Sequence, residues 1–127
     1  MKEIELEKAT LSLLSDNIVK MQIHDGAHLE SRDIVQIHKA KLTMGGNEKH
    51  AVLLLSGKET TITKQAREIS GHQDIGTNRK AKAIVVNSLA QRIIGNFFMR
   101  MQRSESKVKI FNTENEAHLW LNAMMAK

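Results

Sequence analysis

The last third of the chain alternates between short apolar runs and longer segments in which apolar residues recur every three or four positions. Residues 83–86 (Ala-Ile-Val-Val) and 107–111 (Lys-Val-Lys-Ile-Phe) have the β-branched and apolar content that is typical of strands. Each run stops at a polar pair and leads into an amphipathic segment, at 89–102 and from 114 almost to the end. This order predicts two consecutive strand-to-helix units, which are typical of α/β folds with a largely parallel sheet.

Both of these predicted helices begin with capping sequences. Ser88 is followed by Gln91, and Thr113 by Glu116; in such pairs the hydroxyl and the later side chain satisfy backbone amides at the helix start. The apolar residues behind each cap recur with the period of a helix that is packed on one face. They are Leu89, Ala90, Ile93, Ile94, Phe97, Phe98 and Met101 in the first helix, and Ala117, Trp120, Leu121 and Met124 in the second.

The first half of the chain supplies the other predicted strands. Residues 3–14 and 18–23 alternate apolar and polar positions on either side of a polar turn, which predicts an antiparallel hairpin. Residues 50–56 contain the apolar run Ala-Val-Leu-Leu-Leu, which is typical of a strand covered on both faces. We therefore expect 52–55 and 83–86 to be neighbouring, buried, parallel strands.

Two more helices are predicted between these strands. Residues 30–43 have helical periodicity and are followed by Gly45 and Gly46, which can end a helix in a left-handed conformation. Residues 61–70 predict a shorter helix, and the polar segment 71–80 predicts a loop or a broken helical turn. In the first helix Ile34, Ile37 and Lys41 fall on one face, with Val35, His38 and Leu42 beside them. In the second, Ile62, Ala66 and Ile69 are the inward positions.

Composition limits the class of protein. With 127 residues, 41% hydrophobic and 26% charged, and with no linker or repeat, the chain is expected to form one domain over residues 1–127. The absence of cysteine excludes disulfides and thiolate chemistry. Residues 1–7 alternate charged and apolar positions, unlike a secretory signal, and no segment has membrane-spanning length. We therefore expect a cytoplasmic protein.

The net charge of +5 arises in the second half of the chain. Arg92, Arg100 and Arg103 fall on the polar face of the helix predicted at 89–102, where they are candidates for binding an acidic partner. A solvated positive surface explains the same pattern. Nucleic-acid binding is disfavoured, because the chain has no Tyr and its one Trp and three Phe are all expected in or near the core.

The order of strands and helices, together with four short sequences, resembles a known family. The sequences are Ala-Ile-Val-Val-Asn-Ser at 83–88, Gly-Asn-Phe-Phe at 95–98, Val-Lys-Ile-Phe at 108–111 and Glu-Ala-His-Leu-Trp-Leu at 116–121. They resemble the SpoIIAA-like fold of STAS domains and their STAS/SEC14-like relatives, including small uncharacterised bacterial proteins. The resemblance implies an α/β domain with a mixed sheet of about five strands and about four helices. It also implies a non-enzymatic module, either a regulatory protein-binding switch or, as in SEC14-related members, a carrier of a small apolar or lipid-like ligand.

The chain departs from the anti-sigma-factor antagonists of that family at their switch serine. Their Asp-Ser-Ser/Thr-Gly turn follows the third strand, where this chain has Ser-Gly-Lys-Glu-Thr-Thr at 56–61. Thr60 and Thr61 are candidates for phosphorylation, although threonines at a helix start equally serve as caps. Asn87 and Ser88 form a second candidate site, because ligands favour the edge where strands end and helices begin. Ser88 is also a phosphorylation candidate, and a plain capping role accounts for it as well.

Enzyme signatures are absent from the sequence. His24 and His28 have the spacing of metal ligands on a helix, but the Asp-Gly pair between them indicates a turn, and no third ligand is indicated. None of the motifs G-x-S-x-G, H-E-x-x-H, G-x-G-x-x-G or the phosphate-binding P-loop occurs. We therefore expect a non-enzymatic protein without metal or cofactor. Its expected partner is another protein, a second copy of the chain in a homodimer, or a small apolar molecule.

Overall fold

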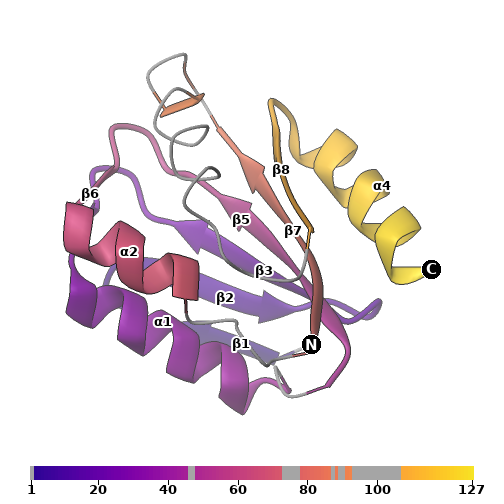
Figure 1. The fold of residues 1–127 in the computed structure, drawn as a ribbon. Helices are drawn as coiled ribbons and strands as arrows, with labels where there is room; N and C mark the ends of the chain where they lie inside the picture. The colour runs from indigo at the N-terminus through magenta and orange to yellow at the C-terminus, as the bar shows by residue number, and fades with distance from the viewer. Residues whose placement is uncertain (1, 46–47, 73–77, 87, 89–90, 93–106) are drawn as a thin grey trace.

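The computed structural model describes residues 2–45, 48–72, 78–86, 88, 91–92 and 107–127. Its centre is a six-stranded sheet with the spatial order β1-β2-β3-β5-β7-β8 (Figure 1). These strands are β1 (Lys2–Glu5), β2 (Ala9–Leu13), β3 (Ile18–Ile23), β5 (His50–Leu55), β7 (Arg79–Val85) and β8 (Lys107–Phe111). Two further strands, β4 (His28–Leu29) and β6 (Thr61–Ile62), pair with each other as a separate small sheet.

The main sheet is antiparallel on one side and parallel on the other. β1, β2 and β3 are joined by antiparallel pairing, whereas β3, β5, β7 and β8 run parallel. In the parallel part, Leu53 pairs with Ala83 and Leu55 pairs with Val85, and all four residues are buried. The predicted pairing of two buried parallel strands is therefore confirmed. Strands covered on both faces carry apolar residues at successive positions, which is why the runs 52–55 and 83–86 show no alternation.

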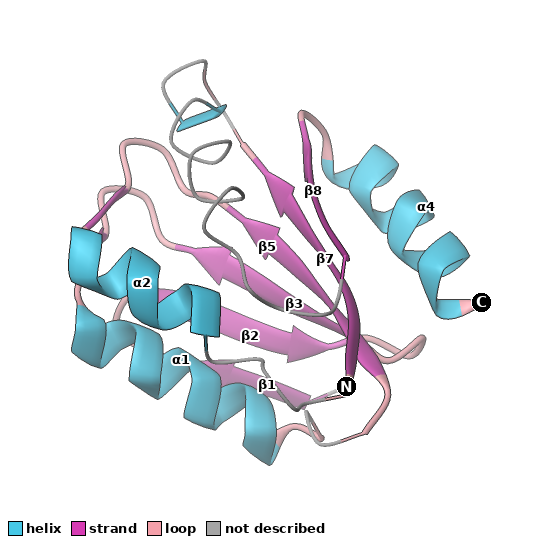
Figure 2. Ribbon diagram, viewed as in Figure 1, coloured by secondary structure: helices cyan, strands magenta, loops and turns pink. Residues whose placement is uncertain are grey.

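Helices cover both faces of the sheet. α1 (Ser31–Thr43) and α2 (Lys64–His72) lie side by side against one face, and α4 (Glu114–Met125) packs against β7, β5 and β8 on the other (Figure 2). Successive residues of β5 show this division: Val52 packs with the residues of α1 and α2, whereas Leu53 packs with Leu121 of α4. Since side chains alternate between the two faces of a strand, the sheet separates two apolar cores.

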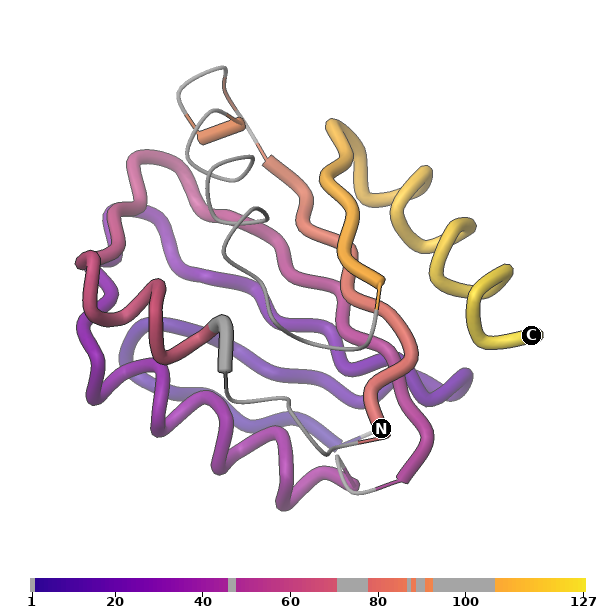
Figure 3. Tube along the Cα trace, in the orientation of Figure 1, coloured from indigo at the N-terminus to yellow at the C-terminus, as the bar shows by residue number. Residues whose placement is uncertain are grey.

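The chain crosses back over the sheet through α1. α1 connects β4 to the start of β5, and because β3 and β5 are parallel, the helix runs opposite to both strands (Figure 3). The last turn of α1 therefore lies near the end of the sheet at which β5 begins. The loop that follows β5 lies at the opposite end.

The predicted strand at 3–14 is wrong, because two strands occupy this segment. The backbone N–H of Leu6 donates to the carbonyl of Ala9 at 2.8 Å, and this turn separates β1 from β2. The main sheet consequently has six strands rather than about five. The second of the two strands pairs with β3, so the predicted hairpin is confirmed for 9–13 and 18–23.

The helix predicted at 61–70 begins later than expected. Thr61 and Ile62 pair with β4, and α2 starts at Lys64. Thr63 caps it, since the backbone N–H of Ala66 donates to Thr63 Oγ1 at 3.1 Å. The helix predicted at 89–102 lies outside the described residues apart from two helical positions, 91 and 92.

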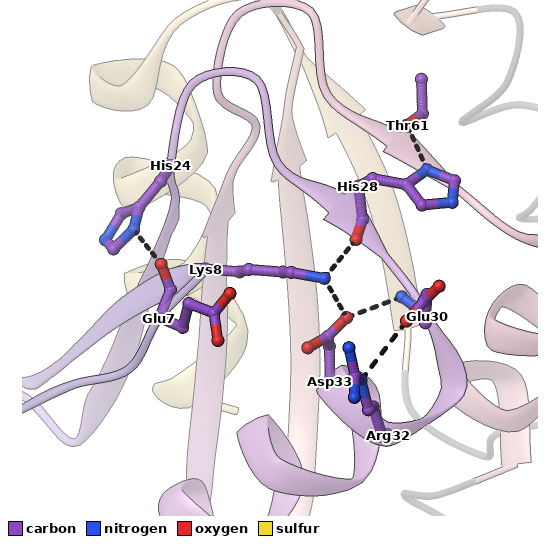
Figure 4. A network of polar contacts seen from close by, with 8 residues as sticks. All are labelled: Glu7, Lys8, His24, His28, Glu30, Arg32, Asp33 and Thr61. Atoms are coloured by element: carbon purple, nitrogen blue, oxygen red, sulfur yellow. Dashed lines mark hydrogen bonds and ion pairs between the residues drawn. The ribbon is translucent and has the colours of Figure 1, made fainter.

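A partly buried ion pair holds the start of α1 in place. Asp33 Oδ2 accepts hydrogen bonds from Lys8 Nζ and from the backbone N–H of Glu30, both at 2.8 Å (Figure 4). Lys8 Nζ also donates to the carbonyl of His28 at 2.7 Å. Burial would raise the pKa of Asp33, but the hydrogen bonds from Lys8 and Glu30 and the charges of Lys8 and Arg32 together hold it below its ordinary value of 3.8. The network ties α1 to the residue before β2 and to β4.

α1 also ends as predicted. Gly45 has a φ of +101°, a conformation that a residue with a Cβ adopts only with strain, and its N–H donates to the carbonyl of Leu42 at 3.2 Å. Ile34, Ile37 and Lys41, which were predicted to share one face, are all buried, whereas Val35, which was predicted to lie beside them, is exposed. Gly46, the second glycine of the predicted stop, lies outside the described residues.

The C-terminal helix is anchored on the sheet at both its cap and its inward face. Thr113 Oγ1 accepts a hydrogen bond from the backbone N–H of Glu116 at 3.2 Å, as the capping sequence predicts. Trp120 contacts Phe111 of β8, with the ring centroids 5.5 Å apart. The predicted inward residues are fully buried (Ala117, Leu121) or partly buried (Trp120, Met124).

Candidate functional site

A cavity of about 300 Å³ lies between the sheet and the helices α1 and α2. This volume is at the lower end of the range of small-molecule sites, which is about 300–1,000 Å³. The floor comes from β3, β5 and β7, whose alternate residues face the same side of the sheet. The apolar floor residues are Met21, Ile23, Val52, Leu54, Ile84 and Val86.

Apolar side chains also form the walls of the cavity. Ile34 and Ile37 of α1 are three residues apart and therefore share one face of the helix. Leu29 and Ile62 contribute from the small sheet, in which they pair with each other. The cavity is thus closed by residues that are distant in the sequence, and no single periodic segment defines it.

Three cationic residues line the same cavity: Lys41 from the last turn of α1, Arg67 from α2 and Lys82 from β7. Lys41 is 1% exposed and Lys82 is 7% exposed. Lysine is almost never buried so deeply unless it is paired, and both residues do make interactions within the protein. Neither Asp nor Glu is found among the described lining residues.

This basic cluster was not predicted from the sequence. A signal was present, since Lys41 occupies an inward position of an amphipathic helix and Lys82 lies within the run Ala-Lys-Ala-Ile-Val-Val. A cation at a position that the pattern assigns to the core calls for an electrostatic explanation. The sequence does not show which strands pair. The pairing places Lys82 opposite Val52 of β5, on the floor below α1 and α2.

The two candidate segments predicted from the sequence meet near the opposite end of the cavity. Gln91 Nε2 donates to the carbonyl of Gly57 at 2.8 Å and to Thr60 Oγ1 at 3.4 Å. The backbone N–H of Gln91 donates to Ser88 Oγ at 3.2 Å, which is one half of the predicted capping box. Ser56, Thr60 and Gln91 all line the cavity. The loop after β5 and the segment after β7 therefore share one edge.

The hydroxyl groups proposed for phosphorylation differ in accessibility. Thr60 is half-buried, and its Oγ1 donates to the carbonyl of Gly57 at 3.2 Å. Thr61 is exposed, and its Oγ1 lies 2.6 Å from His28 Nδ1 (Figure 4). Neither threonine caps α2, so the capping explanation that their position suggested is wrong. Ser88 is exposed and does act as a cap.

Only one arginine of the predicted basic row is among the described residues. Arg92 Nη1 donates to Asn112 Oδ1 at 2.7 Å, which joins the segment after β7 to the segment after β8. Arg100 and Arg103 lie outside the described residues, and so does Asn87. The predicted partner-binding role of these four residues stays a prediction.

The two closely spaced histidines have separate partners in the structure. His24 Nδ1 lies 3.0 Å from the carbonyl oxygen of Glu7, and its Nε2 lies 2.9 Å from Thr10 Oγ1. His28 contacts Thr61 as described above. Within the part of the chain that the structure describes, no cluster of three or more potential metal ligands occurs.

Comparison with known families matches residues 12–125 to a family described as a domain of unknown function, DUF7793. The chain belongs to the DUF7793 family. Among solved structures, this DUF7793 protein is similar to an uncharacterized DUF3478 family protein with a SpoIIAA-like fold from Shewanella loihica PV-4. The TM-score is 0.58 and the identity 15%, over 89% of this chain and 91% of the other. No curated protein matches the sequence.

At this level of identity the similarity shows the fold alone. The DUF7793 protein has a SpoIIAA-like α/β fold, so the fold class implied by the sequence resemblance is confirmed. The described helices are all too short or too polar to cross a membrane.

Proposed function

We propose that this DUF7793 protein is a non-enzymatic binding module that holds a small, mainly apolar molecule in the cavity between α1, α2 and the sheet. The observation that carries the proposal is the cavity itself, with its volume of about 300 Å³ and its apolar floor. Small-molecule sites are typically concave and apolar, with a few polar groups that orient the ligand. Carriage of an apolar ligand is also one of the two functions implied by the sequence resemblance.

The driving force of such binding is the burial of apolar ligand surface. Each CH₂ group that leaves water contributes about 0.8 kcal/mol, before the cost of immobilising the ligand is subtracted. A ligand that contacts Met21, Leu54 and Ile84 on the floor and Ile34 and Ile37 on the wall is enclosed from two sides. The apolar chain supplies affinity, and the polar residues around it supply orientation.

Binding of the neutral fluorescent probe N-phenyl-1-naphthylamine tests this proposal. Replacement of Leu54, a floor residue, by Trp fills the cavity and should weaken probe binding by about tenfold or more, which corresponds to 1.4 kcal/mol. The matched control is Val35→Trp, because Val35 is an exposed residue of α1, at 38% exposure. Failure of the wild-type protein to bind the probe, or equal binding by the two variants, would refute the proposal.

Native mass spectrometry of the purified protein provides a second test. A binding module that retains its ligand should show an added mass that disappears after denaturation and is recovered by organic extraction. The Leu54→Trp variant should carry less of this mass than the Val35→Trp variant.

A second candidate function is a regulatory protein-interaction module of the STAS type. The specific observation in its favour is that two exposed hydroxyls, Thr61 and Ser88, flank the edge at which Gln91 bridges to Thr60. A phosphate on either hydroxyl would add about −1.5 to −2 charges at neutral pH and would change what this edge can bind. Phosphosite mapping of the protein isolated from its native cells tests this function. Absence of phosphate from both Thr61 and Ser88 under all growth conditions would argue against it.

A further inference from the structure

The two outer strands of the main sheet carry opposite charges. β1 is the outermost described strand on one side of the sheet, and β8 is the outermost described strand on the other (Figure 1). Glu3 and Glu5 of β1 are exposed, and so are Lys107 and Lys109 of β8. We propose that copies of this chain associate head to tail, with β1 of one copy pairing in parallel with β8 of the next.

The charged residues of both strands lie on the α4 side of the sheet. Ile4 of β1 packs against the core that contains α1, so the two glutamates on either side of it point to the opposite face. Phe111 of β8 packs with α4, and Lys107 and Lys109 precede it at alternate positions, which places all three on one face. The acidic edge and the basic edge therefore present their charges on the same face.

The apolar residues of the two strands share the other face. Val108 and Ile110 of β8 pack with Leu54 and Ile84, which form part of the cavity floor below α1 and α2. Ile4 of β1 faces the same way. A copy of β8 beside β1 would thus place apolar side chains together on one face and opposite charges together on the other.

The direction of the two strands fits this pairing. β1 is antiparallel to β2 and β2 to β3, whereas the strands from β3 to β8 are parallel, so β1 and β8 run in the same direction. A second copy shifted sideways in the plane of the sheet therefore brings its β8 parallel to β1, with the same face on the same side. The register that places Glu3 beside Lys107 also aligns the second glutamate with the second lysine, because both strands alternate with a period of two.

Symmetric pairing of like edges is disfavoured by charge. A two-fold axis perpendicular to the sheet would pair β1 with its own copy in the antiparallel sense, and residues opposite each other would then point to the same face. The register centred on Ile4 sets Glu3 against Glu5 of the second copy, and the β8 register centred on Val108 sets lysine against lysine in the same way. Like charges directly opposite each other destabilise a strand pair, whereas opposite charges stabilise it.

Charged residues on short edge strands also protect sheets against aggregation. Charge of either sign serves that purpose, so protection alone does not require an acidic edge and a basic edge that match in face and direction. The opposite signs make the two edges complementary. Since exposed ion pairs contribute little, the association is expected to be weak and sensitive to salt.

Analytical ultracentrifugation over a range of protein concentrations tests the proposal, on a chain with no residues added before Met1. Each copy uses one edge for the copy before it and the other edge for the copy after it, so association should continue beyond the dimer as the concentration rises. It should weaken as salt is added. A protein that stays monomeric up to about 1 mM, or that stops at a dimer, would refute head-to-tail pairing.

Charge reversal on each edge identifies the surfaces. The double variant Glu3→Lys/Glu5→Lys makes β1 basic, and Lys107→Glu/Lys109→Glu makes β8 acidic. Each should associate with itself about tenfold more weakly than the wild-type protein, because like charges replace opposite ones. An equimolar mixture of the two should regain association, because the basic β1 of the first variant meets the acidic β8 of the second, and their unchanged edges also carry opposite charges. Circular dichroism melts confirm that both variants are folded.

The matched control is Lys39→Glu/Lys64→Glu, which reverses two exposed lysines of α1 and α2 and changes the net charge as much as the reversal in β8 does. This control should associate as the wild-type protein does. If it loses association to the same extent as the edge variants, or if their mixture does not regain it, the effect is one of net charge and the proposal fails.

Discussion

Gly57, in the loop after β5, lies very close to the backbone at the end of β3. The substitution Gly57→Ala should disrupt this contact. A Cβ at this position would lie 2.5 Å from the carbonyl oxygen of Ile23 and 2.7 Å from the carbonyl carbon and oxygen of His24. Ordinary contact begins at 3.4 Å, so the two backbone segments must separate by about 0.9 Å (3.4 − 2.5). Backbone cannot rotate away as a flexible side chain can. Overpacking of this kind costs about 1–3 kcal/mol.

The same substitution should disturb the edge of the cavity. The carbonyl of Gly57 accepts hydrogen bonds from Gln91 Nε2 at 2.8 Å and from Thr60 Oγ1 at 3.2 Å. A hydrogen bond of this kind contributes about 1 kcal/mol, so weakening them adds to the steric cost. We expect Gly57→Ala to lower the free energy of unfolding by about 3 kcal/mol in total.

Urea denaturation followed by the fluorescence of Trp120, the one tryptophan, measures this loss. The matched control is Gly45→Ala: no atom lies within 4 Å of the added Cβ, but the φ of +101° makes the new residue strained. This control should cost about 1–2 kcal/mol, from backbone strain alone. A loss below about 1 kcal/mol for Gly57→Ala, with an unchanged denaturant slope, would show that the contact relaxes freely and would refute the steric argument.

Three further predictions concern the α4 face and the charged groups. Leu121→Ala removes a fully buried side chain beneath the sheet and should cost about 3 kcal/mol in urea melts followed by circular dichroism, more than Trp120→Ala, because Trp120 is only partly buried. Asp33→Asn should destabilise the protein at neutral pH, because the folded pKa of Asp33 lies below the unfolded value of about 3.8. This difference should persist above pH 3.8 and close as the pH falls through the folded pKa; a gap that stays constant in acid melts would contradict it. Lys20→Met should change stability by less than about 1 kcal/mol, since its 2.9 Å ion pair with Glu114 is exposed to solvent, and a larger loss would show that the pair is structural.

The functional site was predictable only in part. Ser88 and Thr60 were recognisable as candidates because hydroxyls near helix starts have a local signature, but their connection through Gln91 depends on the packing of two loops. In the sequence, Lys41 shares a helix face with Ile34 and Ile37, and Lys82 is one basic residue among several. Only the packing of α1 against the sheet shows that both residues line the same cavity.

Features that depend on a local period could be predicted from the residues alone. The apolar runs of β5 and β7 predicted buried parallel strands, and the spacing of Ile34, Ile37 and Lys41 predicted that they share one face of α1, where all three are buried. The turn at 6–8, which divides the first predicted strand into β1 and β2, was not recognised because the alternation of apolar and polar residues continues on both of its sides.

Features that depend on pairing between distant segments appear only in the folded chain. Thr61 and Ile62 have the sequence of a helix start, yet they form a strand because β4 offers backbone partners. The volume and lining of the cavity were decided in the same way. Each wall residue obeys the period of its own element, but the space between elements is set by crossover direction and strand register, which no local pattern encodes.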